Sequence, residues 1–437
     1  MLVMIKKFME ETAVIQETAI GQVASIQEEA ATLQEQLIEW RRALHQIPET
    51  GITLPQTMAF IKEKLDEMGI AYRAYDDISC IEATIGTGGR CFLLRSDMDA
   101  LPVAEEADIP FKSTNGCMHG CGHDMHAAIL LGAAKLLKAH EGELKGTVKL
   151  LFQSGEEVFQ GAKAAVEAGV LENPHVEAAF AMHVIAMMPV GVLMTGKEAM
   201  ASVDGFKITL TGHGGHGSMP EACVDPINAA VQVYLALQSL IAREIGGTDE
   251  AVLTIGQLAA GEVANVIPER AVLQGTLRTF KKEVREKLVN RIKEVAQGVA
   301  MTYRCQMEYE ALSACPSVIT DDTVTAQVEE SIKSLILEAQ EKENIKALMT
   351  QEQEKENIKS LISRLQVIKG AHGMGSEDFA EITDKVPGAY YMMGAGPEDP
   401  AKRLGQHNPK IEFNEAVIST GAAIYAKTAM DWLEKNA

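Results

Sequence analysis

Apolar residues form helix-like stripes and strand-like runs over the first 190 positions of the chain. A stripe with a period of three to four residues predicts one helix over about 10–44, and a second helix is expected over 56–68, ended by Gly69. The next predicted strands are 91–95, 148–153 and 178–182, and the helices between them are 126–139 and 161–168. Strands that alternate with helices in this way predict an α/β fold with a mainly parallel sheet.

The pattern changes between about residues 191 and 310, where the elements follow the order β-α-β-β-α-β. The expected strands are 206–211, 252–258, 271–279 and 304–309, and the expected helices are 226–244 and 281–300. This order is that of the ferredoxin-like split unit, so we expect a smaller domain inserted into the larger one. The predicted organisation is a helical N-terminal extension (1–37), a large domain (38–190 and 311–437, including a strand at 389–393) and the inserted domain (191–310).

A short duplication lies outside this scheme. The sequence of residues 340–348, Gln-Glu-Lys-Glu-Asn-Ile-Lys-Ala-Leu, recurs almost unchanged at 353–361. Two copies are too few for a repeat protein. The favoured interpretation is a local duplication that lengthens a solvated helix or loop, and a partner-binding helix is the alternative.

Composition narrows the class of protein. Of the 437 residues, 46% are hydrophobic and 23% charged, which is typical of a globular protein. Acidic residues outnumber basic ones by 61 to 40, and a net charge of −21 repels nucleic-acid phosphates and anionic lipids. No apolar run approaches the roughly 20 residues of a membrane helix, and the N-terminus does not read as a secretory signal. We therefore expect a cytoplasmic protein that binds neither nucleic acid nor membranes.

The seven cysteines are an odd number spread over a long chain, so we expect reduced thiols rather than a disulfide framework. Residues 117–126, Cys-Met-His-Gly-Cys-Gly-His-Asp-Met-His, form the densest cluster of reactive side chains. Thiols and imidazoles are ligands that zinc and similar ions prefer. Haem attachment would need Cys-x-x-Cys-His, and a closed structural zinc site would need a second ligand pair. An open metal site is favoured, while structural zinc and redox or inert cysteines remain alternatives.

Acidic and imidazole groups also follow three predicted strands. Asp97 and Asp99 come after the first, Glu156 and Glu157 after the second, and His183 after the third. Paired glutamates are usually solvated surface, but open α/β sheets build their sites at the carboxyl ends of strands. A cation held there could polarise a carbonyl, and a free carboxylate could take a proton from water.

Eight short motifs occur along the chain in a definite order. They are Arg-Arg-Ala-Leu-His-Gln-Ile-Pro-Glu (41–49), Leu-Arg-Ser-Asp-Met-Asp-Ala-Leu-Pro (94–102), Met-His-Gly-Cys-Gly-His-Asp-Met-His (118–126), Gln-Ser-Gly-Glu-Glu (153–157), Ala-Met-His (181–183), Asn-Val-Ile-Pro (265–268), Gly-Thr-Leu-Arg (275–278) and Gly-Ser-Glu-Asp-Phe (375–379). In their order and approximate spacing the chain resembles the N-acyl-amino-acid amidohydrolases, over about residues 38–430. That family includes bacterial aminoacylases, hippurate hydrolases, N-acetyldiaminopimelate deacetylases and plant auxin-conjugate hydrolases.

The resemblance implies a dinuclear metallohydrolase whose large domain is catalytic. It implies two divalent metal ions per subunit, with zinc as the first choice and manganese or cobalt as alternatives. The ligands implied by motif are Cys121, which would bridge the ions, His123, Glu157, His183 and His407. Glu156 resembles the general base, and Asp99 resembles the carboxylate that orients a ligand or the base.

The resemblance also implies that the inserted domain is a lid that forms a homodimer. His216, in the segment 212–220, matches the histidine that reaches the neighbouring subunit's active site and stabilises the oxyanion. Asn265 and Arg278 look like substrate-binding groups. Glu221 stands where histidine is common, which could alter lid contacts or substrate choice.

These observations lead to the expectation of a metal-dependent amidohydrolase. It would cleave the amide bond of an N-acyl-amino acid into a carboxylic acid and an amino acid. The alternatives are a dipeptidase or aminopeptidase of the same architecture and a catalytically silent metal-binding or ligand-binding protein.

Overall fold

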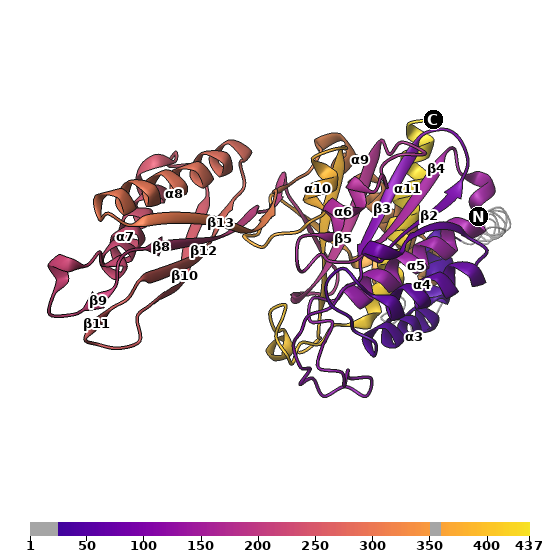
Figure 1. The fold of residues 1–437 in the computed structure, drawn as a ribbon. Helices are drawn as coiled ribbons and strands as arrows, with labels where there is room; N and C mark the ends of the chain where they lie inside the picture. Colours follow the sequence, from indigo (N-terminus) through magenta and orange to yellow (C-terminus); the bar gives the residue numbers. More distant parts are fainter. Residues whose placement is uncertain (1–24, 350–359) are drawn as a thin grey trace, which may run out of the picture.

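Two bodies joined by a narrow connection make up the computed structural model, which describes residues 25–349 and 360–437 (Figure 1). The large domain contains an eight-stranded sheet. In spatial order its strands are β1 (Ala71–Tyr75), β2 (Cys80–Gly86), β4 (Thr147–Gln153), β3 (Cys91–Asp97), β5 (Ala178–Pro189), β16 (Gly388–Gly396), β6 (Val192–Thr195) and β15 (Gln366–Lys369). The central strands β4, β3, β5 and β16 run parallel to one another, so the predicted α/β fold is confirmed.

The antiparallel parts of this sheet were not predicted. The β1–β2 hairpin pairs antiparallel with the rest through β2 and β4, and β6 pairs antiparallel with β16. β1 is partly exposed and β6 has only four residues, so neither shows the continuous apolar run that marks the central strands.

Helices cover both faces of the sheet, as expected for a parallel sheet that is buried on both sides. The larger core packs one face against α3 (Gln34–His45), α4 (Pro55–Glu67), α5 (His123–Ala139), α9 (Asp322–Met349) and α11 (Ile418–Lys435). The smaller core packs the other face against α6 (Gly161–Glu167) and α10 (Ala380–Thr383). The sequence places apolar residues on both sides of β3 and β4, which is why every residue of these strands is buried.

The lid domain is a four-stranded antiparallel sheet in the order β10–β12–β8–β13, with two helices on one face (Figure 1). Its elements are β8 (Val203–Thr211), α7 (Pro226–Glu244), β10 (Ala251–Ala260), β12 (Arg270–Thr279), α8 (Lys282–Thr302) and β13 (Gln306–Cys315). This is the predicted β-α-β-β-α-β order. Pro226 at the first turn of α7 and the Asp225 carboxylate, which accepts the Ile227 N–H at 2.8 Å, define where that helix begins.

The observed elements differ in detail from the expected segments. β6 falls inside the segment expected for the lid, yet it pairs with the large sheet, and the lid sheet itself runs from Val203 to Cys315. Within the segment expected as an N-terminal extension, α2 (Ile26–Thr32) buries Ile26 and Ala30 in the core of the large domain. The helix expected over 10–44 divides at Leu33 into α2 and α3, and residues 1–24 lie outside the described part.

The duplicated sequence is described only in part. The first copy, 340–348, lies in the carboxyl-terminal half of α9, and most of the second copy falls in 350–359, outside the described residues. Short strand pairs β7 (Glu198–Met200) with β14 (Val318–Ile319) and β9 (Gly215–His216) with β11 (Val266–Ile267) complete the fold. Among the described helices, none combines the length and apolarity required to cross a membrane.

Candidate metal centre and active site

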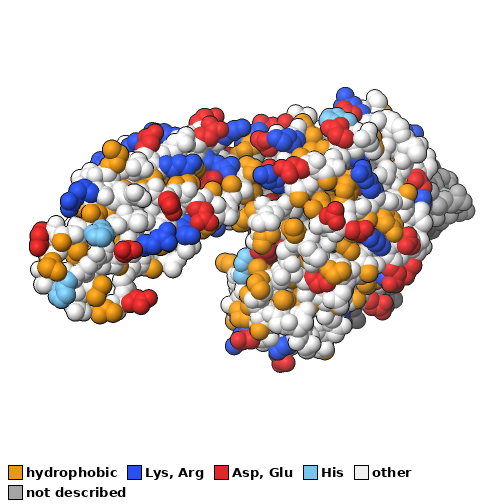
Figure 2. Space-filling model, in the orientation of Figure 1, with side chains coloured by type: hydrophobic (Ala, Val, Ile, Leu, Met, Phe, Trp, Pro, Cys, Tyr) orange, Lys and Arg blue, Asp and Glu red, His pale blue; other side chains and the backbone are white. Residues whose placement is uncertain are grey.

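The polar side chains at the carboxyl ends of β3 and β4 lie level with His183 of β5. β5 continues to Pro189, past the segment 178–182 expected from the sequence, so His183 lies within the strand and does not follow it. The three strands are parallel neighbours, and Arg95 of β3 pairs with Ala181, two residues before His183. The fourth contributor is the turn before α5, where Gly122 adopts φ +91°, a left-handed conformation that favours glycine, and carries Cys121 and His123 to the same place. Figure 2 shows the molecule hollowed between the lid and the large domain.

Five possible metal ligands form two groups that share one thiol. Cys121, His123 and His183 can direct ligand atoms to within 4.8 Å of one another, and so can Cys121, Glu157 and His407. Cys121 Sγ lies 3.4 Å from His183 Nε2, and Glu157 Oε2 lies 3.4 Å from His407 Nε2. The structure therefore brings together all five side chains that the sequence motifs suggested as ligands.

The hydrogen bonds of His123 and His183 engage their Nδ1 atoms and leave their Nε2 atoms available to coordinate a cation. His123 Nδ1 donates to the Asp99 carbonyl at 2.9 Å, and His183 Nδ1 donates to the Val184 carbonyl at 2.8 Å. Metal-binding histidines are commonly oriented by such a bond from the outer nitrogen. His123 Nε2 and Glu157 Oε1 are buried and have no hydrogen-bond partner among the described residues, which a bound cation would satisfy.

The Cys121 thiol also indicates a site for a cation. Burial raises the pKa of Cys121 to about 12, so the thiol stays neutral at pH 7 unless a cation replaces its proton. A thiol, three imidazoles and a carboxylate are a donor set that suits divalent transition metals. The residues present thus fit two divalent cations.

Glu156 lies beside these ligands but belongs to neither Cys121 group. Its Oε2 is 3.9 Å from His123 Nε2. Burial raises the pKa of Glu156 well above its usual range, and the nearby Glu377 and Asp378 carboxylates raise it further. A carboxyl group of high proton affinity beside a metal centre suits general acid–base chemistry.

Asp99 holds both glutamates through the backbone. Its Oδ1 accepts the N–H of Glu156 at 3.0 Å, and its Oδ2 accepts the N–H of Glu157 at 3.1 Å. Its carbonyl also accepts His123 Nδ1. Asp99 is therefore placed to position a ligand from each of two elements and the candidate base, without itself reaching the cavity.

His126 connects the helix and the strand that carry ligands. Its Nδ1 donates to Asp97 Oδ1 at 2.5 Å, and its Nε2 accepts the Val184 N–H at 2.8 Å. Because both ring nitrogens are occupied, His126 is not free to coordinate a cation in this arrangement. It holds α5 against β5 next to His183.

The sequence did not predict a buried network of ion pairs next to the site. Arg95 binds Asp97 at 2.7 Å and Asp378 at 2.6 Å, and Asp378 also accepts Gln153 Nε2 and the Ala162 N–H. Burial would raise the pKa of Asp97, but His123, His126 and Arg95 outweigh it and lower that pKa. These residues lie in the motifs 94–102, 153–157 and 375–379, yet nothing local shows that one arginine joins all three.

A cavity of about 290 Å³ opens next to the ligands. Four of the candidate ligands line it, namely Cys121, Glu157, His183 and His407. Its other lining residues are Glu156, Phe159, Ile185, Met200, Arg278, Gly375, Ser376, Glu377, Tyr390, Met392 and Gln406. Two of its lining residues have positive φ without being glycine, Phe159 at +54° and His407 at +68°. Such strained conformations persist where surrounding structure enforces them, and they cluster at functional sites.

The three lid residues suggested by the sequence lie in different places. Arg278 lines the cavity, and its Nη1 donates to the Met374 carbonyl at 2.8 Å and to Ser376 Oγ at 3.1 Å. His216 belongs to β9, Asn265 directly precedes β11, and both are exposed. The β9–β11 pair lies at the outer end of the lid, remote from the large domain of the same chain (Figure 1). A single chain therefore does not bring these two to the site.

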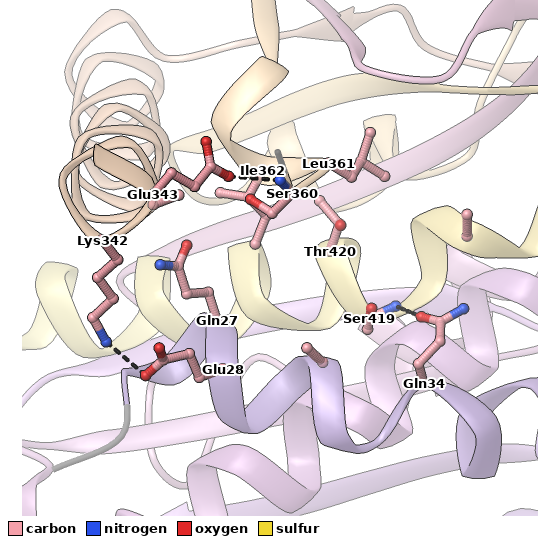
Figure 3. A pocket seen from close by; sticks show the side chains of 13 residues that line it. Gln27, Glu28, Gln34, Lys342, Glu343, Ser360, Leu361, Ile362, Ser419 and Thr420 are labelled. Atoms are coloured by element: carbon pink, nitrogen blue, oxygen red, sulfur yellow. Dashed lines mark hydrogen bonds and ion pairs between the residues drawn. The ribbon is translucent and has the colours of Figure 1, made fainter. Parts of the chain in front are cut away.

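A second cavity, of about 420 Å³, lies between α2, α9 and α11 (Figure 3). Its charged groups are already partnered: Lys342 binds Glu28 at 2.6 Å, and Glu343 accepts the Ser360 N–H at 2.6 Å. It has no histidine or cysteine among its lining residues. The smaller cavity beside Cys121 is thus the better candidate active site.

Comparison with known proteins agrees with this geometry. N-acetylcysteine deacetylase of Bacillus subtilis is 35% identical over 405 residues, covering 91% of this chain and 97% of that protein. IAA-amino acid hydrolase ILR1-like 2 of Arabidopsis thaliana is 34% identical, covering 92% and 86%. The crystal structure of the Bacillus subtilis YXEP protein, a dinuclear metal binding peptidase from the M20 family, superposes with a TM-score of 0.73 at 32% identity, covering 92% and 99%. The family model described as Peptidase family M20/M25/M40 matches residues 93–431, and the chain belongs to this family.

Proposed function

We propose that this protein is a metal-dependent amidohydrolase that cleaves N-acyl-amino acids into a carboxylic acid and an amino acid. The observation that carries the proposal is the pair of ligand groups sharing Cys121, with the free carboxyl group of Glu156 beside them and Arg278 on the cavity wall. Relatives named for deacetylating N-acetylcysteine and for hydrolysing IAA-amino acids support the substrate class.

The chain's residues divide the chemistry between them. When bound, two divalent cations would supply Lewis-acid polarisation of the scissile carbonyl and of water. Cys121 would be shared between them, with His123 and His183 on one side and Glu157 and His407 on the other. The donor set of thiolate and imidazole favours zinc over manganese or cobalt.

Glu156 would move the proton. Its raised pKa allows its carboxylate to take a proton from the attacking water and to deliver that proton to the departing amide nitrogen. Asp99, by holding the N–H groups of Glu156 and Glu157, would keep the base and a ligand at a constant separation.

Arg278 would recognise the α-carboxylate of the substrate. A guanidinium can bind a carboxylate with two parallel hydrogen bonds, and only one terminal nitrogen of Arg278 is engaged by the loop at Met374 and Ser376. An N-acyl-amino acid presents this carboxylate at a constant distance from the scissile amide.

His216 and Asn265 would act on the active site of a partner subunit in a homodimer. β10 is an exposed edge strand of the lid sheet, and Val252 and Leu258 on it are exposed apolar residues. α7 adds exposed Val231, Tyr234 and Leu235 next to β10. An unpaired edge flanked by apolar side chains is suited to pairing with a second copy of the same edge.

The substrate class is tested with metal-stripped protein reloaded with zinc, manganese or cobalt. We expect cation-dependent hydrolysis of N-acetyl-, N-benzoyl- and indoleacetyl-amino acids, and poor hydrolysis when the α-carboxylate is amidated. Arg278→Ala should lower kcat/KM for the free acids by a factor that corresponds to about 2–4 kcal/mol of lost transition-state stabilisation. The matched control Arg270→Ala, at the exposed start of the same strand, should leave kcat/KM unchanged. Hydrolysis of free dipeptides alone would instead identify a peptidase, and no hydrolysis with any metal would identify a silent binding protein.

Action across the dimer is tested with mixed subunits. A heterodimer of His216→Ala and Glu156→Gln chains has one complete site if His216 acts in the partner, and none if it acts in its own chain. A heterodimer of wild type with the doubly substituted chain gives the opposite result. Activity in the second heterodimer and none in the first would refute action in trans.

A further inference from the structure

We propose that Phe159, Ile185 and Met392 form an acyl wall, an apolar surface that binds the acyl group of the substrate and makes the enzyme prefer acyl groups longer than acetyl. This inference rests on the proposed amidohydrolase function. It adds the chemical class of the acyl group and the residues that select it.

The first support is the direction of β5. Side chains two residues apart on a strand point to the same face and lie about 6.6 Å apart along it. His183 and Ile185 therefore lie on one face, while Val184 on the other face is buried in the larger core. His183 is a candidate ligand, so Ile185 places an apolar side chain next to the metal centre, before the irregular pairing with β16 that begins after it.

The second support comes from the neighbouring strand. β16 pairs parallel with β5, and Met392 stands opposite His183 in the register. Paired residues share a face of the sheet, so the Met392 side chain lies next to His183. Methionine is flexible and polarisable, which suits contact with acyl chains of differing shape.

Phe159 is the third residue of the acyl wall. It follows Glu157 by two residues, lines the cavity and holds φ at +54°. A left-handed conformation costs an aromatic residue about 1–2 kcal/mol, and Phe159 nevertheless keeps it. The partly buried Phe159 and Ile185 side chains pack against the same smaller core as Met392.

The position of Arg278 indicates which half of the substrate meets this wall. Arg278 is anchored at Met374 and Ser376, so a carboxylate bound there places the amino-acid half on that side of the cavity. On the β5 side the loop of His407 borders the cavity, and Gln406 holds it there, since its Nε2 donates to the Val184 carbonyl at 2.7 Å. The acyl half then lies along β5.

The cavity of about 290 Å³ has to hold both halves of the substrate beside the candidate ligands, so its volume limits the length of the acyl group.

The test uses zinc-loaded protein and N-acyl-L-alanines with acetyl, butanoyl, hexanoyl and octanoyl groups. Each methylene buried on the wall should raise kcat/KM about fourfold, until the chain extends past Ile185 and the gain stops. Ile185→Ala should reduce the hexanoyl-to-acetyl ratio about tenfold. The matched control Ile368→Ala, at an exposed isoleucine of β15 that does not line the cavity, should leave this ratio unchanged.

Equilibrium binding of the same series to Glu156→Gln protein provides a readout independent of turnover and should show the same dependence on length. If Ile185→Ala does not fold, the milder Ile185→Val replaces it, with a smaller change in the same direction.

Several outcomes would overturn the acyl wall. They are a flat or falling series in the wild type, equal ratios for the Ile185 and Ile368 variants, or a gain that follows the amino-acid side chain in N-acetyl-amino acids. If N-acetyl-L-alanine is hydrolysed but longer acyl groups bring no gain, only the acyl wall fails. If no N-acyl-alanine is hydrolysed with any metal, the proposed function itself fails.

Discussion

Asp99→Asn isolates what one buried carboxylate contributes to the order of the site. Asp99 is 1% exposed, and its two oxygens accept the N–H groups of Glu156 and Glu157 at 3.0 and 3.1 Å. Asparagine has the same shape, but only one of its two terminal atoms can accept. One charge-assisted hydrogen bond is therefore lost, and one buried N–H is left facing another donor. A lost bond to a charged acceptor is worth about 1.5–3 kcal/mol, so the free energy of unfolding should fall by about 2–3 kcal/mol.

The assay is urea unfolding of the cation-free protein, followed by tryptophan fluorescence. The chain has two tryptophans, Trp40 on α3 and Trp432 on α11, and both are buried in the larger core, so the signal reports the large domain. The matched control is Asp108→Asn, at an exposed aspartate of the same domain, which should change the free energy by less than about 0.5 kcal/mol.

A change at Asp99 as small as the control's would refute the reasoning, because it would mean that the carboxylate does not order the two glutamates. A loss confined to the metal-loaded protein would also contradict it, since the two N–H bonds join protein groups alone.

Other changes separate proton transfer, metal retention and surface charge. Glu156→Gln should keep two ions per subunit by metal analysis but lose nearly all turnover, and substantial activity in the metal-replete variant would exclude Glu156 as the base. Cys121→Ser should lose metal on dialysis because a hydroxyl is a poorer anionic ligand than a thiolate, so unchanged stoichiometry and affinity would exclude Cys121 as a ligand. Burial opposes protonation of His140, but hydrogen bonds with Glu143 and Glu29 outweigh it and raise its pKa. The resulting stability is present below about pH 6.5 and lost as pH rises through the raised pKa, so His140→Gln should destabilise the protein more at pH 6 than at pH 9, by less than about 1 kcal/mol in urea unfolding. An equal effect at both pH values would show that His140 acts only by packing.

The sequence alone predicted the elements whose signal is local. β3, β4 and β5 are continuous apolar runs because they are buried on both faces, and the lid order follows from strand and helix periods that change at clear boundaries. Cys121, His123, Glu156, Glu157 and His183 were also found from sequence, because they lie in short motifs next to predicted strands and in one glycine-containing turn. His407 has no such local signal and was suggested by the family resemblance.

The sequence did not predict elements that owe their place to their neighbours. β1 and β6 are short or half exposed, so they are strands only because β2 and β16 offer them hydrogen-bonding edges. The boundary between lid and large domain was uncertain for the same reason, since β6 is assigned by its pairing and not by its pattern.

Tertiary structure alone decided the network beneath the site and the positions of the lid residues. Arg95 and Asp378 are 283 positions apart in the chain, and Gln153 and Asp378 are 225 apart, yet they are in contact because the segment between β15 and α10 reaches the carboxyl ends of β3 and β4. Likewise, Arg278 and His216 both belong to the lid, but β12 returns Arg278 to the cavity, whereas the β9–β11 pair holds His216 at the far end. Periodicity and motifs record which side chains face a core or carry chemistry. Contacts between distant segments depend on strand order and chain direction, which no local pattern encodes.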